Sequence, residues 1–181
     1  MEAEAAKTPL ERFLLCPPPK HFKPAGDVIW AEFSEAPDFV PETRRARGRR
    51  AQGIRYEKRA QEYLLEALEE GYCASPWIRF RSEQYSRPRY CQPDGVLFDI
   101  EGGKLTVFEI KLQHTIDAWW QLEHLYLPVL RHLFPPKWWS YATCEFVKWY
   151  DPATAFPVRP ALCADLRDIR PEQFGVHIWN P

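Results

Sequence analysis

The sequence predicts an α/β protein in which a central mixed β-sheet is flanked by helices. Two segments, at about 53–70 and 115–134, carry apolar residues at helical spacing. The runs 77–85, 93–111 and 138–150 contain the β-branched and aromatic residues that favour strands. Helix, strands, helix and strand thus follow one another, and this order is typical of a sheet with helices packed against it.

The first helix is expected from about Gly53 to Glu70. Its apolar face is made by Tyr56, Ala60, Tyr63, Leu64, Ala67 and Leu68. At 100° per residue, Glu57 falls within about 20° of Leu64 and Leu68, on the flank of that face. A carboxylate buried there without a partner is costly, and a metal ion shared with other carboxylates would supply one. The alternative is an ion pair with an arginine such as Arg59 or Arg89.

The strands that follow are expected to form a hairpin around Gly102-Gly103, because two glycines between alternating runs predict a two-residue turn. In that register Val96 faces Glu109 and Asp94 faces Lys111. Directly opposed residues share one face of a sheet. The hairpin therefore predicts that Asp94, Glu109 and Lys111 converge on one patch.

The second helix is expected from Thr115, a plausible N-cap, to Phe134, with a bend at Pro128. The aromatic-rich run 138–150 then predicts a strand, and "GVHIW" near the end of the chain predicts another. His114, just before the second helix, is expected at the surface.

The 181 residues suit one domain with an added arm. Residues 1–43 are Pro-rich and are expected to form an arm with little regular structure, although "DVIWAEF" could pack on the body. Residues 44–181 are expected to form the single domain. The Pro- and Trp-rich ends would also suit contact with a protein partner.

Charge is concentrated in one segment, although the net charge is only −1. Residues 44–59 hold eight Arg or Lys and a single acid. Clustered arginines can contact phosphates without reading sequence. The arginines expected to contact nucleic acid are Arg44, Arg45, Arg47, Arg49, Arg50 and Arg55. A solvated, non-binding stretch is the alternative.

Several classes of protein are disfavoured by the sequence. It contains no apolar run long enough for a membrane span, and its acidic N-terminus does not resemble a secretory signal. Its five cysteines form no CxxC pair, which favours reduced thiols in a cytoplasmic protein. It also lacks a P-loop, a dinucleotide-binding fingerprint and a GxSxG elbow.

Carboxylates beside a lysine predict a site for a hard cation. Mg²⁺ prefers a few carboxylates together with waters and substrate phosphate. Glu57, Asp94 and Glu109 could supply these ligands, and the backbone carbonyl of Ile110 could add another. Such an ion can lower the pKa of an attacking water, and Lys111 could hold that water or stabilise negative charge in the transition state.

These residues resemble the PD-(D/E)XK nuclease superfamily. Pro93-Asp94 is followed, after fourteen residues, by Glu109-Ile110-Lys111, and "GIRYE" with Glu57 resembles the first-helix segment of that family. The resemblance spans roughly 53–133. It implies a restriction-endonuclease-like core and Mg²⁺- or Mn²⁺-dependent cleavage of DNA, with a role in DNA recombination or repair. It also implies catalytic roles for Glu57, Asp94, Glu109 and Lys111.

Gln121 resembles a glutamine of the RecB-like and lambda-exonuclease-like branch, where it would serve the active site. That branch has a tyrosine four residues later, whereas this chain has Leu125 at that place and Tyr126 one residue further. Gln121 could equally be a solvated helix residue.

Two other interpretations stay open. Asp94, Glu109 and Lys111 could form cross-strand salt bridges on an exposed sheet face, which are worth little. A nuclease-like fold could also be catalytically inactive and bind DNA or a protein partner. Whether cleavage would be exo- or endonucleolytic does not follow from the sequence.

Overall fold

The computed structural model describes residues 16–39, 46–154 and 156–181. The first fifteen residues of the expected arm, and Arg44 and Arg45, lie outside these ranges. The strands and helices follow in the order β1 (Val28–Ser34), α2 (Gly48–Leu68), β2 (Tyr72–Ala74), β3 (Trp77–Ser82), β4 (Arg89–Cys91), β5 (Gly95–Asp99), β6 (Lys104–Gln113), α3 (Ile116–Gln121), η1 (Leu122–Tyr126), α4 (Leu127–Leu133), β7 (Ser140–Trp149), β8 (Ala161–Leu162) and β9 (Phe174–Ile178).

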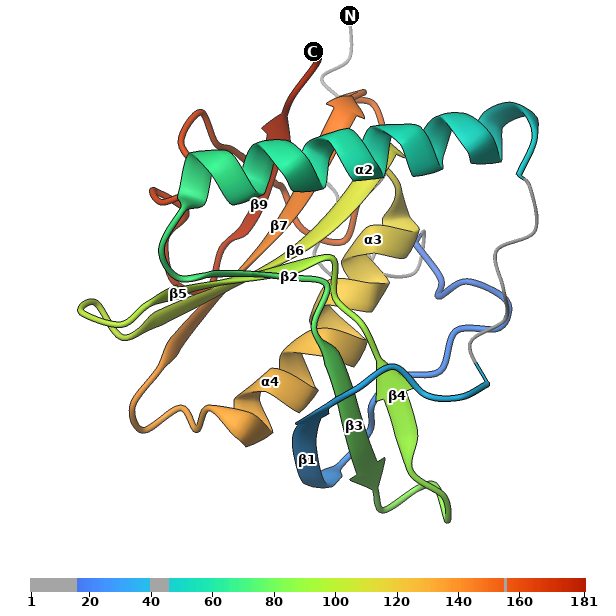
Figure 1. Ribbon diagram of the computed structural model, residues 1–181, viewed down its shortest axis with the longest axis vertical. Helices are drawn as coiled ribbons and strands as arrows, with labels where there is room; N and C mark the ends of the chain where they lie inside the picture. The colour runs from blue at the N-terminus through green and yellow to red at the C-terminus, as the bar shows by residue number, and fades with distance from the viewer. Residues whose placement is uncertain (1–15, 40–45, 155) are drawn as a thin grey trace, which may run out of the picture.

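The main sheet has six strands in the order β2-β5-β6-β7-β9-β8. Strands β2, β5 and β6 are antiparallel, whereas β6, β7, β9 and β8 are parallel, so the sheet is mixed, as the sequence predicts. Figure 1 shows α2 on one side of this sheet and α3 and α4 on the other. The predicted fold class is therefore confirmed.

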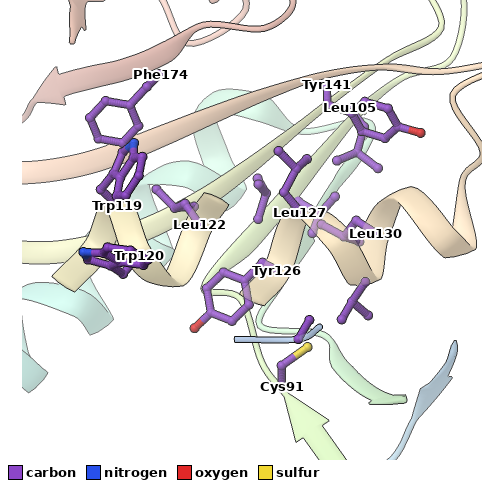
Figure 2. Packing of buried hydrophobic residues seen from close by; sticks show 14 of the residues in the cluster. Cys91, Leu105, Trp119, Trp120, Leu122, Tyr126, Leu127, Leu130, Tyr141 and Phe174 are labelled. Atoms are coloured by element: carbon purple, nitrogen blue, oxygen red, sulfur yellow. The ribbon is translucent and has the colours of Figure 1, made fainter. Parts of the chain in front are cut away.

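Alternation along β6 divides the core into two layers. Phe108 and Ile110 pack with Tyr56 and Leu64 of α2, while Leu105 and Val107 pack with the helices on the opposite face. Figure 2 shows this second layer, where Trp119, Leu122 and other helical side chains meet residues from the strands. Side chains at odd-numbered positions of β6, including 109 and 111, thus lie on the side of α3.

A second, smaller sheet is formed by β1, β3 and β4, and it lies beside α4 (Figure 1). β1 comes from "DVIWAEF" in the Pro-rich segment and pairs with β3 in antiparallel fashion. Upstream of it, Cys16 and Ala25 are buried. The part of the arm that the structure describes is thus packed on the body.

The first helix begins at Gly48, five residues before the expected start at Gly53. Its buried residues are Tyr56, Ala60, Leu64 and Leu68, as the apolar spacing predicts, whereas Tyr63 is half-buried and Ala67, also expected on this face, is exposed. The early start was missed because the first turn is polar and exposed, so it adds nothing to the apolar period.

The two-residue turn at Gly102-Gly103 is a wrong prediction. The last pair of the hairpin is Asp99 with Lys104, which leaves residues 100–103 as a four-residue loop. The carboxylate of Asp99 accepts a hydrogen bond from the Gly102 amide at 2.9 Å, and Gly103 adopts φ 58°. The register therefore differs by two residues from the expected one, and Val96 pairs with Val107 instead of Glu109. A shift of two preserves the face of every side chain.

The second helical segment covers the expected span as three consecutive pieces, α3, η1 and α4. Pro128 has no amide hydrogen for the carbonyl of His124, four residues earlier. That carbonyl instead accepts a hydrogen bond from the amide of Ala25 at 2.8 Å. The irregular helix thereby anchors the N-terminal segment. In the part of the chain that the structure describes, no helix is long and apolar enough to cross a membrane.

Candidate active site

Asp94 lies directly before β5 and is fixed through its own backbone. Its carbonyl accepts hydrogen bonds from the amide of Ser75 at 2.9 Å and from Nε2 of Gln61 at 2.5 Å. Gln61 is itself held by the hydroxyl of Tyr72. The Asp94 carboxylate accepts a hydrogen bond from the Ile110 amide at 2.6 Å. Helix α2, β2 and β6 thus position one carboxylate.

Glu109 and Lys111 lie two residues apart on β6, so their side chains share a face. The ammonium of Lys111 lies 2.5 Å from Oε1 of Glu109. Glu109 is only 3% exposed, and its other oxygen, Oε2, is buried without a hydrogen-bond partner among the described residues. Glu109 is therefore buried, Lys111 is half-buried, and the pair lies along one strand, which contradicts the alternative of an exposed cross-strand salt bridge.

The two carboxyls disfavour each other's ionisation. Burial raises the pKa of Asp94 well above its usual value, and the negative charge of Glu109 adds to the effect, while the Ile110 amide opposes it. Burial also raises the pKa of Glu109, although Lys111 and the hydroxyl of Tyr126 oppose it. Two neighbouring carboxyls with raised pKa values are suited to share a proton or a cation.

Lys111 remains an ammonium despite its environment. Burial lowers the pKa of Lys111, but attraction to Glu109, and more weakly to Asp94 and Glu57, outweighs burial, so the pKa is raised. This lysine is therefore a hydrogen-bond donor and a positive charge at the centre of three acids.

Glu57 lies at the surface of α2, not buried on its packing flank as the sequence suggests. Partial desolvation raises the pKa of its carboxyl, and the charge of Lys111 opposes this. Among the described residues it forms no ion pair with Arg59 or Arg89, and Arg89 instead donates to the carbonyls of Lys23 and Pro24. Glu57 is thus the outermost of the three acids around Lys111.

Gln121 and Tyr126 meet because the helix contains a π turn. In an α-helix, residues five apart lie about 140° from each other. The π-helical segment η1 follows Gln121 and widens the turn, which brings residues five apart onto one side. Nε2 of Gln121 donates a hydrogen bond to the Tyr126 hydroxyl at 3.4 Å. Tyr126 therefore lies on the same side of the helix as Gln121, although the two are five residues apart.

A cleft of about 590 Å³ opens beside Lys111 and Gln121. Thr115 and Asp117 line the same side of it, and the N-terminal segment lines the other side with Lys20, His21 and Phe22. The ring of Phe22 packs against Trp120. Sequence reasoning missed this wall, because nothing local in a Pro-rich segment shows where it docks.

A buried pair of His114 and Glu145 lies beside the acids. Glu145 pairs with Glu109 across the parallel strands β7 and β6, so both carboxyls lie on one face. Nδ1 of His114 contacts Oε2 of Glu145, and the Thr115 amide donates to Oε1 at 2.9 Å. His114 is therefore buried, and the expectation of surface placement is wrong. Burial raises the pKa of Glu145, and His114 opposes this.

The described arginines of the predicted cluster lie on or next to α2. Arg47 precedes the helix, Arg49 and Arg50 lie in its first turn, and Arg55 follows one turn later. All four are exposed, and within the described ranges none of them forms an ion pair. Their guanidinium groups are available to an anionic partner.

The carboxylates of Asp94 and Glu109 are of the type that binds a hard divalent cation. In this structure they contact the Ile110 amide and the Lys111 ammonium. Across residues 16–39, 46–154 and 156–181, no group of three or more His, Cys, Asp or Glu side chains is arranged as a metal site. Glu109 nevertheless has an oxygen without a donor, next to Asp94. The Ile110 amide points to Asp94. The N–H and C=O groups of one strand residue point to the same edge of the strand, so the Ile110 carbonyl points to the edge where Asp94 lies. Oxygen ligands of this kind suit Mg²⁺ or Mn²⁺.

Comparison with protein-family models, with curated proteins and with solved structures gave no match. The function of this chain is therefore inferred from its own residues and their geometry.

Proposed function

We propose that this protein is a metal-dependent nuclease that hydrolyses phosphodiester bonds of DNA. The observation that carries the proposal is the grouping of Asp94, Glu109 and Lys111 below the cleft. The buried carboxyl of Glu109 and the half-buried carboxyl of Asp94, both with raised pKa values, lie around an ammonium, and one carboxylate oxygen lacks a donor among the described residues. Such a cluster is costly to fold unless it serves a ligand.

A divalent cation is the ligand that would offset the repulsion between the carboxylates of Asp94 and Glu109. Asp94 and Glu109 would hold Mg²⁺ or Mn²⁺, with the Ile110 carbonyl and Glu57 at its outer side. When bound, the cation would supply positive charge near the phosphate and lower the pKa of a water. The protein's contribution is to keep both carboxyls fixed, through Gln61 on the Asp94 backbone and through Tyr126 beside Glu109.

Lys111 would act as a donor, not as the general base, because its pKa is raised. When the attacking water adds to phosphorus, negative charge grows on the phosphoryl oxygens before the P–O bond to the leaving group breaks. An ammonium directed at those oxygens stabilises that charge. Gln121, on the same wall of the cleft, would orient the phosphate or the Lys111 side chain.

The charges around the cleft favour a polyanionic substrate. Lys20 and Lys111 line the cleft together with one acid, Asp117, and the exposed arginines of α2 add positive charge on the other side of the sheet. Phosphate contacts of this type position nucleic acid without reading its sequence. DNA is therefore the proposed partner, through Arg47, Arg49, Arg50 and Arg55 in the described part of the cluster.

The proposal is tested by digestion of plasmid and linear DNA with Mg²⁺, Mn²⁺ or EDTA. The wild type is compared with Lys111→Ala and with Lys137→Ala, an exposed lysine in the loop after α4. We expect metal-dependent cleavage that Lys111→Ala reduces by roughly 100-fold or more, as for loss of a transition-state donor, and that Lys137→Ala leaves unchanged. Cleavage of Lys111→Ala at the wild-type rate would refute the site.

The same assay identifies the type of cleavage and the competing function. Cutting of linear DNA alone indicates an exonuclease, whereas nicking of circles indicates an endonuclease. If the wild type binds DNA but cuts neither form with any metal, the fold serves as a binding module for DNA or a protein partner.

A further inference from the structure

A second hollow, of about 320 Å³, lies on the other side of β6 from the cleft. Helix α2 contributes Gln52, Arg55, Tyr56 and Arg59, and the ends of β6 and β7 contribute Leu112, Lys148 and Trp149. Leu112 directly follows Lys111, which lines the cleft, so the end of one strand separates the two hollows. We refer to the hollow of these seven residues as the α2–β7 hollow.

The lining of the α2–β7 hollow is positive at its rim and apolar within. Arg55 and Arg59 lie one helical turn apart and are exposed, and Lys148 faces them from β7. None of the described residues that line the hollow is acidic. Within the described chain, these three cations form no ion pair. A ligand with negative charge and a flat apolar part matches this lining.

Trp149 offers a fixed aromatic surface. Its indole is 50% exposed, although it is one of the largest apolar side chains of the protein. Its backbone carbonyl accepts a hydrogen bond from the amide of His114 at 2.9 Å, which holds the end of β7 in place. The ammonium of Lys148 lies 5.3 Å from the centre of the ring. Half of the residue stays exposed beside this ammonium, which leaves aromatic surface on which a base can stack.

We propose that the α2–β7 hollow binds an unpaired nucleotide of a single-stranded DNA segment that flanks the candidate active site. The base would stack on Trp149, and the adjacent phosphates would contact Arg55 and Arg59. Stacking requires a base with a free face, which a strand inside a duplex does not offer. The inference depends on the proposed function for the identity of the substrate, and it adds that the substrate has a single-stranded part.

The test is DNA binding in EDTA, where no metal-dependent cleavage takes place. Fluorescence anisotropy of a labelled 15-nucleotide oligo-dT is compared with that of a blunt 15-base-pair duplex. We expect Trp149→Ala to weaken oligo-dT binding by roughly 5- to 100-fold, because stacking of one base contributes to that extent, and to change duplex binding little. Trp149→Phe, which keeps an aromatic face, should restore most of the affinity.

Trp138 provides a matched control. It is 69% exposed and carries Lys137 at 4.8 Å from its ring centre, but it lies in the loop after α4. Trp138→Ala should leave oligo-dT binding unchanged. The double variant Arg55→Ala, Arg59→Ala should reduce the slope of log affinity against log salt by roughly 1.4, since each phosphate contact on a single strand contributes about 0.7.

Wild-type affinity of Trp149→Ala for oligo-dT would overturn the proposal, and so would equal losses in the Trp149 and Trp138 variants. Equal weakening of duplex and oligo-dT binding would also overturn it, because stacking on an unpaired base would not be the cause. None of these results affects the nuclease proposal, which is decided separately by cleavage in Lys111→Ala.

Discussion

Replacement of Asp94 by Asn should stabilise the metal-free protein while it removes the activity. Asp94 lies against Glu109, and burial together with that neighbour raises its pKa. An asparagine keeps an oxygen that can accept from the Ile110 amide, as Oδ2 of Asp94 does at 2.6 Å. Its amide group replaces an acceptor near Glu109 with a donor. The substitution therefore relieves repulsion without a loss of the backbone contact.

The size of the gain follows from the cost of a buried polar group without a partner, about 1–3 kcal/mol. For a chain of this length, 1 kcal/mol changes Tm by roughly 2–4 °C. We expect Asp94→Asn to raise Tm by roughly 2–12 °C in EDTA at pH 8, on the basis of both relations. Asp168→Asn, the same chemical change at an exposed position, is the control and should leave Tm unchanged.

The pH dependence has a definite sign. Because the pKa of Asp94 is higher in the folded than in the unfolded state, the folded state keeps its proton over a window in which the unfolded state has lost it. The free energy of unfolding of the wild type therefore falls as pH rises through that window, and the loss is complete above the folded-state pKa. Asp94→Asn lacks this group, so its Tm should fall less between pH 4 and pH 8.

Bound metal should make the wild type more stable than Asp94→Asn, which reverses the order of their Tm values in EDTA. A ligand at 100 times its Kd stabilises the folded state by about 2.7 kcal/mol, and only the wild type has the full set of carboxylates. Differential scanning fluorimetry with EDTA, Mg²⁺ and Mn²⁺ measures all of these changes. If Asp94→Asn is less stable than the wild type in EDTA at pH 8 and has the same pH profile, the Asp94 carboxylate is a stabilising structural acceptor, and the reasoning fails.

Three further outcomes are expected. Tyr126→Phe removes a hydrogen bond that lowers the pKa of Glu109. The acidic limb of the cleavage pH–rate profile should therefore move to higher pH. An unmoved limb would contradict a role for the contact between Tyr126 and Glu109. Glu145→Leu leaves His114 and the Thr115 amide without their buried acceptor and should destabilise the fold by about 3–5 kcal/mol in urea unfolding, whereas Glu172→Gln, in the exposed pair with Arg131, should cost at most about 1 kcal/mol. Phe80→Ala, at a fully buried position, should cost about 3–5 kcal/mol in the same assay, and a cost below 1 kcal/mol would contradict the packing.

The parts of the fold that could be predicted are those with a local signal. The stripe of Tyr56, Ala60, Leu64 and Leu68 identified α2 because it follows the helical period. The convergence of Asp94, Glu109 and Lys111 was predicted with the wrong register and still holds, since a shift of two residues keeps every side chain on its face. A bulge of one residue would have removed it.

The parts that escaped prediction depend on contacts between distant segments. His114 and Glu145 are 31 residues apart, and no local pattern in the sequence indicates that they pair. The pairing of β7 beside β6 alone brings Glu145 next to Glu109. Likewise, the position of Lys20 and His21 at the cleft depends on the docking of the N-terminal segment, which leaves no periodic pattern in the sequence.

Pro128 links that docking to the geometry of the site. A proline in a helix removes one amide donor and crowds the preceding turn, and the helix here responds with the π turn η1, which ends two residues before it. The turn brings Tyr126 to Gln121 and Glu109, and the freed carbonyl of His124 receives the amide of Ala25. One residue that weakens a regular helix thus accounts both for the tyrosine beside the candidate site and for the anchor of the segment that forms the opposite wall of the cleft.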